Sequence, residues 1–202
     1  MKKKWIFIAV AVLAAVALAV TGLLLMKQKK DQPGFHFVDG RLYANVNGSG
    51  YAFLMDDKGQ IPEKDCEGQT QIVVQGSTDA NDNFKGTLSV SGFPVTEKGT
   101  ISGAATMVDA GNGFYEIHWN PVCTHEEVVG ETNDQGATLS THSTKQTHSC
   151  NYQYIYQFCS EKPEFAAVYI YDIAKADYYC VILADSEAQA RELFRWMKDN
   201  EK

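Results

Sequence analysis

Between Trp5 and Met26 the sequence has no charged residue, and only Thr21 and Gly22 interrupt an otherwise apolar run of 22 residues. As an α-helix this run would be about 33 Å long, enough to cross a hydrocarbon core of roughly 30 Å. A helix in the core of a globular domain rarely stays uncharged for so long. We therefore interpret residues 5–26 as a transmembrane signal anchor.

Residues 1–30 also have no acidic residue, while lysines stand at positions 2, 3, 4, 27, 29 and 30. Because a short basic N-terminus usually stays in the cytoplasm, we expect residues 1–4 to be cytoplasmic and the bulk of the chain to lie outside, after a linker at 27–34. A cytoplasmic C-terminal domain is the rival orientation. Ala15-Val16-Ala17 and Ala17-Leu18-Ala19 fit a cleavage site, so secretion after cleavage is the alternative localisation.

Basic residues are scarce in the remainder of the chain. Residues 31–202 hold 12 basic and 25 acidic residues, a net formal charge of −13. Phosphate backbones would repel such a domain, which argues against a nucleic-acid partner. Its length suits one domain with a full-sized core.

Catalytic motifs are absent as well. The chain has no serine nucleophile elbow, no phosphate-binding glycine loop and no Cys-x-x-Cys. His125-Glu126-Glu127-Val128-Val129 begins like a zinc-protease helix, but Val129 stands where the second histidine is required. Asp79-Ala80-Asn81-Asp82-Asn83 begins like a calcium loop, but Phe84 replaces its glycine. Nothing here is specific enough to identify an enzyme.

What the chain does contain is strand-like alternation with tight turns. Asp39-Gly40 favours a type I′ turn, and Asn47-Gly48-Ser49-Gly50 predicts a second turn. The fold class we predict is α+β, mostly β, with an N-terminal transmembrane helix followed by a curved antiparallel sheet, sandwich- or barrel-like, and one C-terminal helix packed on it. The predicted strands are 35–38, 41–46, 51–55, 70–75, 84–93, 100–108, 114–119, 150–159, 165–172 and 177–184.

The C-terminal helix is predicted over residues 186–200 of the extracytoplasmic domain 35–202. Ser186 and Gln189 form a capping box, with Ser186 as N-cap and Gln189 reaching back to it. Four apolar residues follow at helical spacing and predict the face that packs on the sheet: Ala190, Leu193, Phe194 and Met197.

Residues 121–149 are polar, and we expect a long loop there. Its ends carry the candidate metal ligands His125, His148, Cys123 and Cys150, residue types that bind zinc. Only one residue separates the ligands in each pair, whereas zinc motifs usually leave two to four, so solvated polar side chains are the competing interpretation. We expect no cofactor, and zinc is the alternative.

The five cysteines are Cys66, Cys123, Cys150, Cys159 and Cys180. Outside the cell they allow up to two disulfides and one spare thiol, with the pairing left open. In the cytoplasm they would be small buried hydrophobes.

A tyrosine stripe is the second candidate site. Tyr152, Tyr154 and Tyr156 alternate along one strand, with Tyr169 and Tyr171 on a neighbouring one. Together they would form an aromatic binding face for a sugar or peptide. Cross-strand packing inside the sheet is the competing interpretation.

We therefore expect a single-pass membrane protein whose acidic extracytoplasmic domain is a binding or scaffolding module for an unknown protein or glycan ligand. A metal-dependent enzyme or metal-binding protein that uses residues 118–150 is the alternative.

Overall fold

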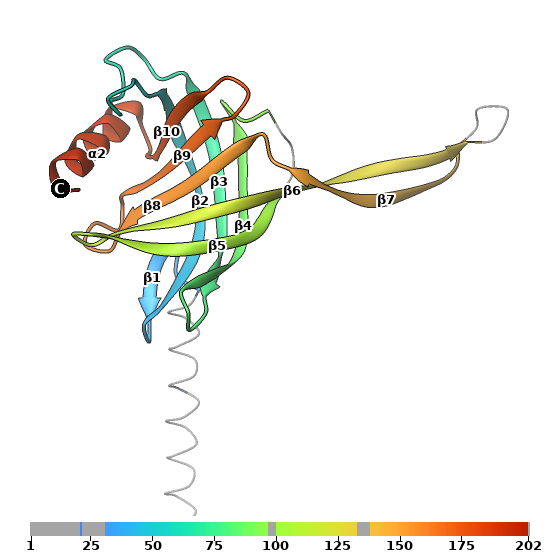
Figure 1. Ribbon diagram of the computed structural model, residues 1–202, viewed down its shortest axis with the longest axis horizontal. Helices are drawn as coiled ribbons and strands as arrows, with labels where there is room; N and C mark the ends of the chain where they lie inside the picture. The colour runs from blue at the N-terminus through green and yellow to red at the C-terminus, as the bar shows by residue number, and fades with distance from the viewer. Residues whose placement is uncertain (1–20, 22–30, 97–99, 133–137, 202) are drawn as a thin grey trace, which may run out of the picture.

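The computed structural model describes residues 21, 31–96, 100–132 and 138–201, and for residues 100–104 and 120–148 it describes the backbone alone. These residues form one antiparallel sheet and a C-terminal helix, α2, as predicted (Figure 1). The elements are β1 (Gly34–Val38), β2 (Arg41–Leu54), β3 (Gly68–Thr78), β4 (Asn83–Gly92), β5 (Thr100–Gly111), β6 (Phe114–Thr132), β7 (Thr138–Ser149), β8 (Tyr152–Cys159), β9 (Ala166–Asp172), β10 (Asp177–Leu183) and α2 (Glu187–Asn200).

Within the described part of the chain, no helix has the length and apolar character needed to cross a membrane. The predicted transmembrane helix at 5–26 lies outside the described residues except for Thr21, as does the basic tail at 1–4.

The sheet closes on itself. Its strand order is β1-β2-β10-β9-β8-β6-β5-β4-β3, and β3 pairs back onto β2. Closure is achieved because β2 pairs with β3 along 43–52, while the other pairings of β2 are shared between β1 at 41–45 and β10 at 50–54. The barrel-like form of the prediction is therefore the one adopted.

Of the two predicted glycine turns, one is present and the other is not. Asp39 and Gly40, with φ of 50° and 75°, connect β1 to β2, which confirms the predicted tight turn. The turn predicted at 47–50 is wrong, because β2 runs through it. A Cβ on Gly50 would lie 2.7 Å from Val181 Cγ1 and 2.8 Å from the Ile182 carbonyl oxygen, so glycine allows β10 to approach here.

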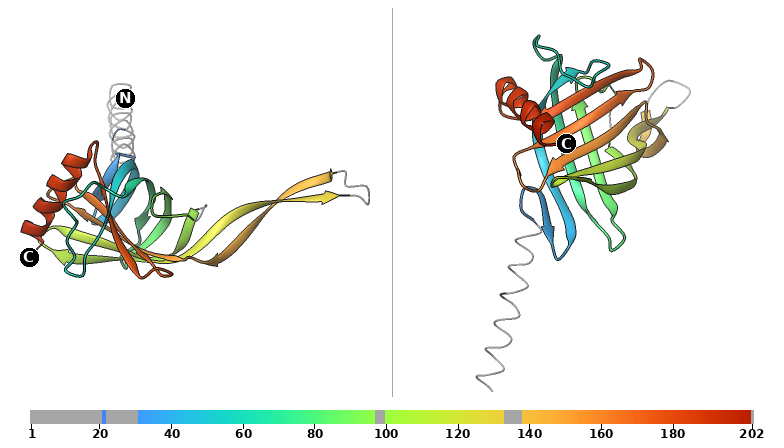
Figure 2. Two further views of the ribbon diagram at one scale, coloured as in Figure 1. Left: turned by 90° about the horizontal axis from the view of Figure 1, so that it is seen from above. Right: turned by 60° about the vertical axis from the view of Figure 1, so that its left-hand side comes forward.

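The polar segment 121–149 is not a loop. β6 continues to Thr132 and pairs with β7 from Val122↔Ser149 to Thr132↔Thr138. Valine recurs in this part of β6 and threonine recurs along β7, and β-branched residues favour extended backbone even where few side chains are apolar. This two-stranded arm projects from the body on the side away from α2 (Figures 1 and 2).

The closed sheet separates two hydrophobic clusters. Side chains that point inward form the larger one, which includes Leu42, Ile72, Ile117 and Val181. Strand alternation places the intervening residues on the outer wall, where part of the wall is covered by α2. Between α2 and this part of the wall lies the second cluster, which consists of Phe53, Phe114, Cys159, Phe165, Ala167, Cys180, Ile182, Ala190, Leu193, Phe194 and Met197.

The helix begins as predicted. The Ser186 hydroxyl accepts a hydrogen bond from the Gln189 backbone N–H, and the four predicted apolar residues are buried. The Gln189 side chain, however, accepts from the Asp185 N–H at 2.9 Å rather than from Ser186.

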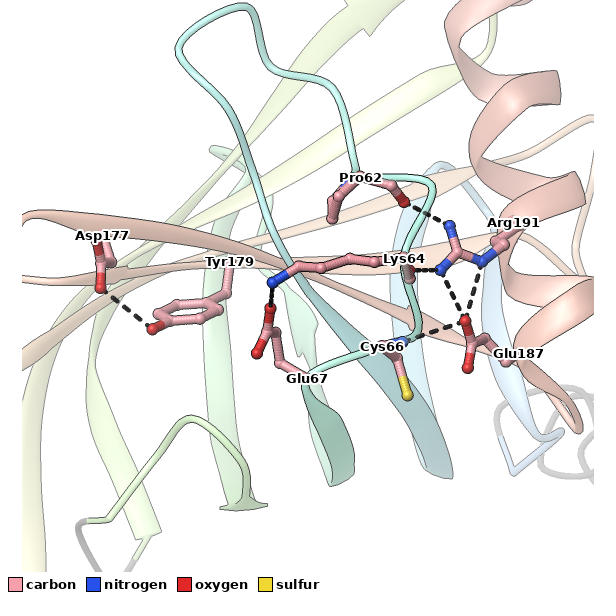
Figure 3. A network of polar contacts seen from close by, with 8 residues as sticks. All are labelled: Pro62, Lys64, Cys66, Glu67, Asp177, Tyr179, Glu187 and Arg191. Atoms are coloured by element: carbon pink, nitrogen blue, oxygen red, sulfur yellow. Dashed lines mark hydrogen bonds and ion pairs between the residues drawn. The ribbon is translucent and has the colours of Figure 1, made fainter.

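A polar network ties the 55–67 connection to α2 (Figure 3). Arg191 donates to the Pro62 carbonyl at 2.6 Å and also to the carbonyl of Lys64. The Glu187 carboxylate accepts from Arg191 at 2.7 Å and from the Cys66 N–H at 3.1 Å. Hydrogen bonding to Arg191 holds the pKa of Glu187 below its usual range, whereas burial raises the pKa of the Cys66 thiol.

Candidate ligand-binding groove

The wall of the closed sheet forks where the arm leaves it. β6 pairs with β8 from Phe114↔Cys159 to Trp119↔Tyr154, and then pairs with β7 from Val122↔Ser149 onward. β8 continues to Tyr152, still paired with β9. Beyond Trp119, β6 and β8 are therefore no longer joined by backbone hydrogen bonds, and the wall is open at this point.

A groove of about 540 Å³ lies at the fork. Its lining includes outward residues of the wall and also buried inward residues next to the point where β6 separates from β8. The aromatic lining residues are Trp119, Tyr152, Tyr154, Tyr169, Tyr171 and Tyr178, and the remaining ones are His118, Ser149, Cys150, Gln153, Ile155 and Ile173.

Cross-strand register builds the outer part of the groove. Ile155 on β8 pairs with His118 on β6 and with Tyr169 on β9. In the next row, Tyr171 on β9 pairs with Gln153 on β8 and with Tyr178 on β10. Since cross-strand partners share a face, these two rows form one continuous surface.

The most exposed part of this surface is aromatic. Tyr171 and Tyr178 stack with their ring centroids 4.4 Å apart and their planes at 27°. Tyr178 is 56% exposed and Ile173 beside it is 49% exposed. Large apolar side chains that remain this exposed in a cluster commonly mark a binding surface.

A buried polar network supports the other row. Gln157 is fully buried, and its side-chain amide donates to Glu201 at 2.9 Å and to Glu116 at 3.4 Å. Its carbonyl accepts from the Tyr169 hydroxyl at 3.2 Å. On the outer side, His118 Nε2 lies 2.6 Å from Glu116 Oε2. His118 and Tyr169 are thus held in place at the edge of the groove.

These contacts set the charge of the groove. Glu116 and Glu201 place carboxylates behind it. Burial, with nearby Cys180, Glu201 and Glu116, raises the pKa of Tyr169, so its phenol stays neutral and keeps its hydrogen. The surface offers aromatic faces, hydroxyl and amide groups and a negative surrounding potential, which suits a neutral ligand better than an anion.

The structure divides the predicted aromatic face. Tyr152, Tyr154 and Tyr156 point into the closed sheet and are 4%, 1% and 0% exposed. Tyr169 and Tyr171 pair with Ile155 and Gln153, which alternate with those three, and so belong to the outer wall. The fork nevertheless brings Tyr152 and Tyr154 to the same groove as Tyr169 and Tyr171, whereas Tyr156 is not among the lining residues.

For three of the four predicted metal ligands the structure describes only the backbone. Cys123 pairs with His148 across the base of the arm, and His125 pairs with Gln146, but their side chains lie outside those that the structure describes. Cys150 is buried and forms a disulfide, which removes the thiolate that zinc would require. Among the described residues, no group of three or more histidine, cysteine or acidic residues is arranged to hold a metal.

The disulfide also limits the cysteine pairing. Cys66, Cys159 and Cys180 are free thiols, so the expected maximum of two disulfides is not reached. Besides these three and Cys150, the sequence contains one further cysteine, Cys123.

Sequence reasoning missed the groove residues Trp119, Ile155, Ile173 and Tyr178. Trp119 and Ile155 looked like ordinary strand residues, and only the register and the fork bring them into one lining. One signal was available in the sequence. Tyr178 and Tyr179 are adjacent tyrosines in a predicted strand, and because side chains alternate along a strand, one of the two must point outward.

No protein-family model, no curated protein and no solved structure matches the chain.

Proposed function

We propose that this chain is a single-pass membrane protein whose extracytoplasmic domain binds a neutral saccharide in the groove at the fork. Residues 5–26 anchor it, and the acidic domain faces outward. The observation that carries the proposal is the groove itself, which has the Tyr171–Tyr178 stack in its lining and Tyr169 on the same outer face.

Saccharides fit this surface for a chemical reason. The C–H faces of a sugar ring pack on aromatic rings, while its hydroxyls need hydrogen-bond partners around the edge. Tyr171 and Tyr178 supply the rings, and Gln153, Ser149 and His118 supply polar groups along the same lining. Tyrosine gives wide contact area at low conformational cost, which suits recognition.

The compartment is supported separately. Cys150 forms a disulfide, and disulfides persist in oxidising environments outside the cytoplasm. The free thiols Cys159 and Cys180 are buried at 3% and 0% exposure, and burial raises the pKa of Cys180 to about 12, so both are protected from oxidation.

The test is binding of full-length protein in lipid nanodiscs to an array of neutral and sulfated oligosaccharides. We expect neutral oligosaccharides to bind and sulfated ones to bind poorly. Tyr171→Ala and Tyr178→Ala each remove one stacked ring, so each weakens binding roughly tenfold.

Tyr51→Ala is the matched control. Tyr51 is an outer-wall tyrosine on β2 that lines a different hollow, so its loss should leave binding unchanged. Absence of binding to every saccharide, or equal loss in Tyr51→Ala, contradicts the proposal.

Metal binding at the base of the arm, with His125 and His148 as the candidate ligands, is the second candidate, favoured by the backbone register that places these two residues at diagonal positions of the β6–β7 pair. It requires near-stoichiometric zinc in protein purified without added metal, with loss of that zinc in His125→Ala or His148→Ala. Metal-free protein of unchanged stability would exclude it.

A further inference from the structure

We propose that Gln157 is the positioning residue of the groove, and that its buried amide holds both polar ends of one row of the lining. It fixes Tyr169 directly and His118 through Glu116. The inference rests on the proposed function, because it names the residue that sets the geometry of the same groove for its saccharide.

Gln157 lies behind the row formed by His118, Ile155 and Tyr169. It follows Ile155 by two positions along β8 and so shares its face of the wall, and it pairs with Glu116 on β6. Gln157 is fully buried and is not among the residues that line the groove. It therefore acts on a ligand through residues that do line it.

The amide of Gln157 is engaged on both sides. Its oxygen accepts from the Tyr169 hydroxyl at 3.2 Å, and its nitrogen donates to Glu116 Oε1 at 3.4 Å and to Glu201 Oε1 at 2.9 Å. The other oxygen of Glu116, Oε2, lies 2.6 Å from His118 Nε2. An amide has two donor hydrogens and one carbonyl, so these three bonds set which way it faces. One side chain thus connects the two polar residues at opposite ends of the row.

Tyr169 lies at the boundary between the groove and the part of the wall under α2. It lines the groove, and it also packs against the cluster beneath the helix. Its hydroxyl is bonded to Gln157 and lies 3.2 Å from Met197 Sδ on α2. The hydroxyl is therefore engaged beneath the helix, which leaves the ring for the ligand.

A positioning role differs from a purely structural one in where the contacts lead. Of the three contacts of the amide, one ends at Tyr169 and one continues through Glu116 to His118, and both of these residues line the groove. The third, to Glu201, holds the amide from the end of α2. Loss of the amide should therefore change ligand affinity and not stability alone.

The experiment measures the affinity of the full-length chain in nanodiscs for the neutral oligosaccharide that the wild type binds most tightly on the array. We expect about tenfold weaker binding in Gln157→Leu, which removes the amide, and about threefold in Tyr169→Phe, which removes only the hydroxyl bonded to it. Because both substitutions break the same contact, the double variant should bind no more weakly than Gln157→Leu alone.

Thr78→Val is the matched control. Thr78 is 3% exposed and its hydroxyl accepts from the Leu42 N–H at 3.0 Å, but it does not line the groove. Its substitution removes a buried polar contact elsewhere in the sheet, so we expect lower stability in urea with unchanged affinity. An equal loss of affinity in Thr78→Val would show that any loosening of the sheet weakens binding, and would overturn the inference.

A second measurement needs no ligand. In the ¹H–¹³C spectrum, the ring signal of His118 should shift in Gln157→Leu and stay fixed in Thr78→Val, because the amide reaches His118 through Glu116. An unchanged His118 signal in Gln157→Leu contradicts the connection.

The remaining outcomes separate this inference from the proposed function. If Gln157→Leu does not fold, Tyr169→Phe decides, since it keeps the ring and the amide. Unchanged affinity in Tyr169→Phe, or additive losses in the double variant, overturns the inference and leaves the saccharide groove intact. A wild type that binds no oligosaccharide on the array removes the proposed function and this inference together.

Discussion

The outer wall of the closed sheet has two halves, one covered by α2 and one without a helix over it. In the covered half, Phe53, Cys180 and Ile182 lie beneath α2 and are fully buried. In the bare half, made by Ile155, Tyr171 and Tyr178, the same strands carry apolar residues with no helix over them. The helix buries the apolar residues on one side, whereas those on the other side need a different explanation, and the proposed saccharide binding supplies one.

Removing a large side chain from the covered half should have the greatest effect. Phe194 is 2% exposed and packs in the cluster under α2. Phe194→Ala leaves a cavity that the surrounding side chains fill only in part, so we expect a loss of about 3–5 kcal/mol in unfolding free energy by urea denaturation. A loss below about 1 kcal/mol would show that α2 is not required for the fold.

Loss of the contacts between the 55–67 connection and α2 should have the second-largest effect on stability. Arg191→Ala removes the donor to the carbonyls of Pro62 and Lys64 and leaves the partly buried Glu187 without its cationic partner. We expect a loss of about 1–3 kcal/mol in the same assay. Arg195→Ala, an exposed arginine one turn further on, is the control and should change stability by less than about 0.5 kcal/mol.

The bare half should contribute little to stability. Tyr178 is mostly exposed and its principal contact is the stack with Tyr171. Tyr178→Ala should therefore cost about 1 kcal/mol or less in unfolding free energy while weakening saccharide binding. A loss as large as that of Phe194→Ala would erase the distinction between the two halves.

The smallest effect should appear as a pH dependence in the covered half. Arg191 lowers the folded-state pKa of Glu187 below its ordinary value of 4.5, so the ionised carboxylate stabilises the fold above that pH. This contribution should fade as the pH falls from 4.5 through the lowered pKa. Denaturation of wild type and Glu187→Gln at several pH values should show a difference near neutrality that narrows in acid; a difference that widens in acid contradicts the assignment.

Local signals in the sequence were sufficient for part of this fold. The Asp39-Gly40 turn and the Ser186 N-cap depend on neighbouring residues, and both are found where predicted. The turn predicted from the glycines of the 47–50 segment was wrong. Gly50 is needed for the close approach of β10, a strand about 130 positions further along the chain, and local sequence patterns carry no information on such distant contacts.

The groove lay beyond sequence reasoning for the same reason. The tyrosine stripe was found, but its division into inward and outward sets follows from the β8–β9 register, which pairs Ile155 with Tyr169. The fork beside Trp119 depends on β7 taking the place of β8 along β6. Low apolar content hid that arm, although its threonines favour strands.

Hydrogen exchange of the full-length chain in nanodiscs, with and without a neutral oligosaccharide that binds on the array, tests most directly whether the bare half is the ligand site. We predict added protection at the fork and along the neighbouring strands, in residues 152–156 and 169–178, with residues 187–200 of α2 unchanged. Protection confined to α2 or to the arm, with the bare half unchanged, would contradict the account.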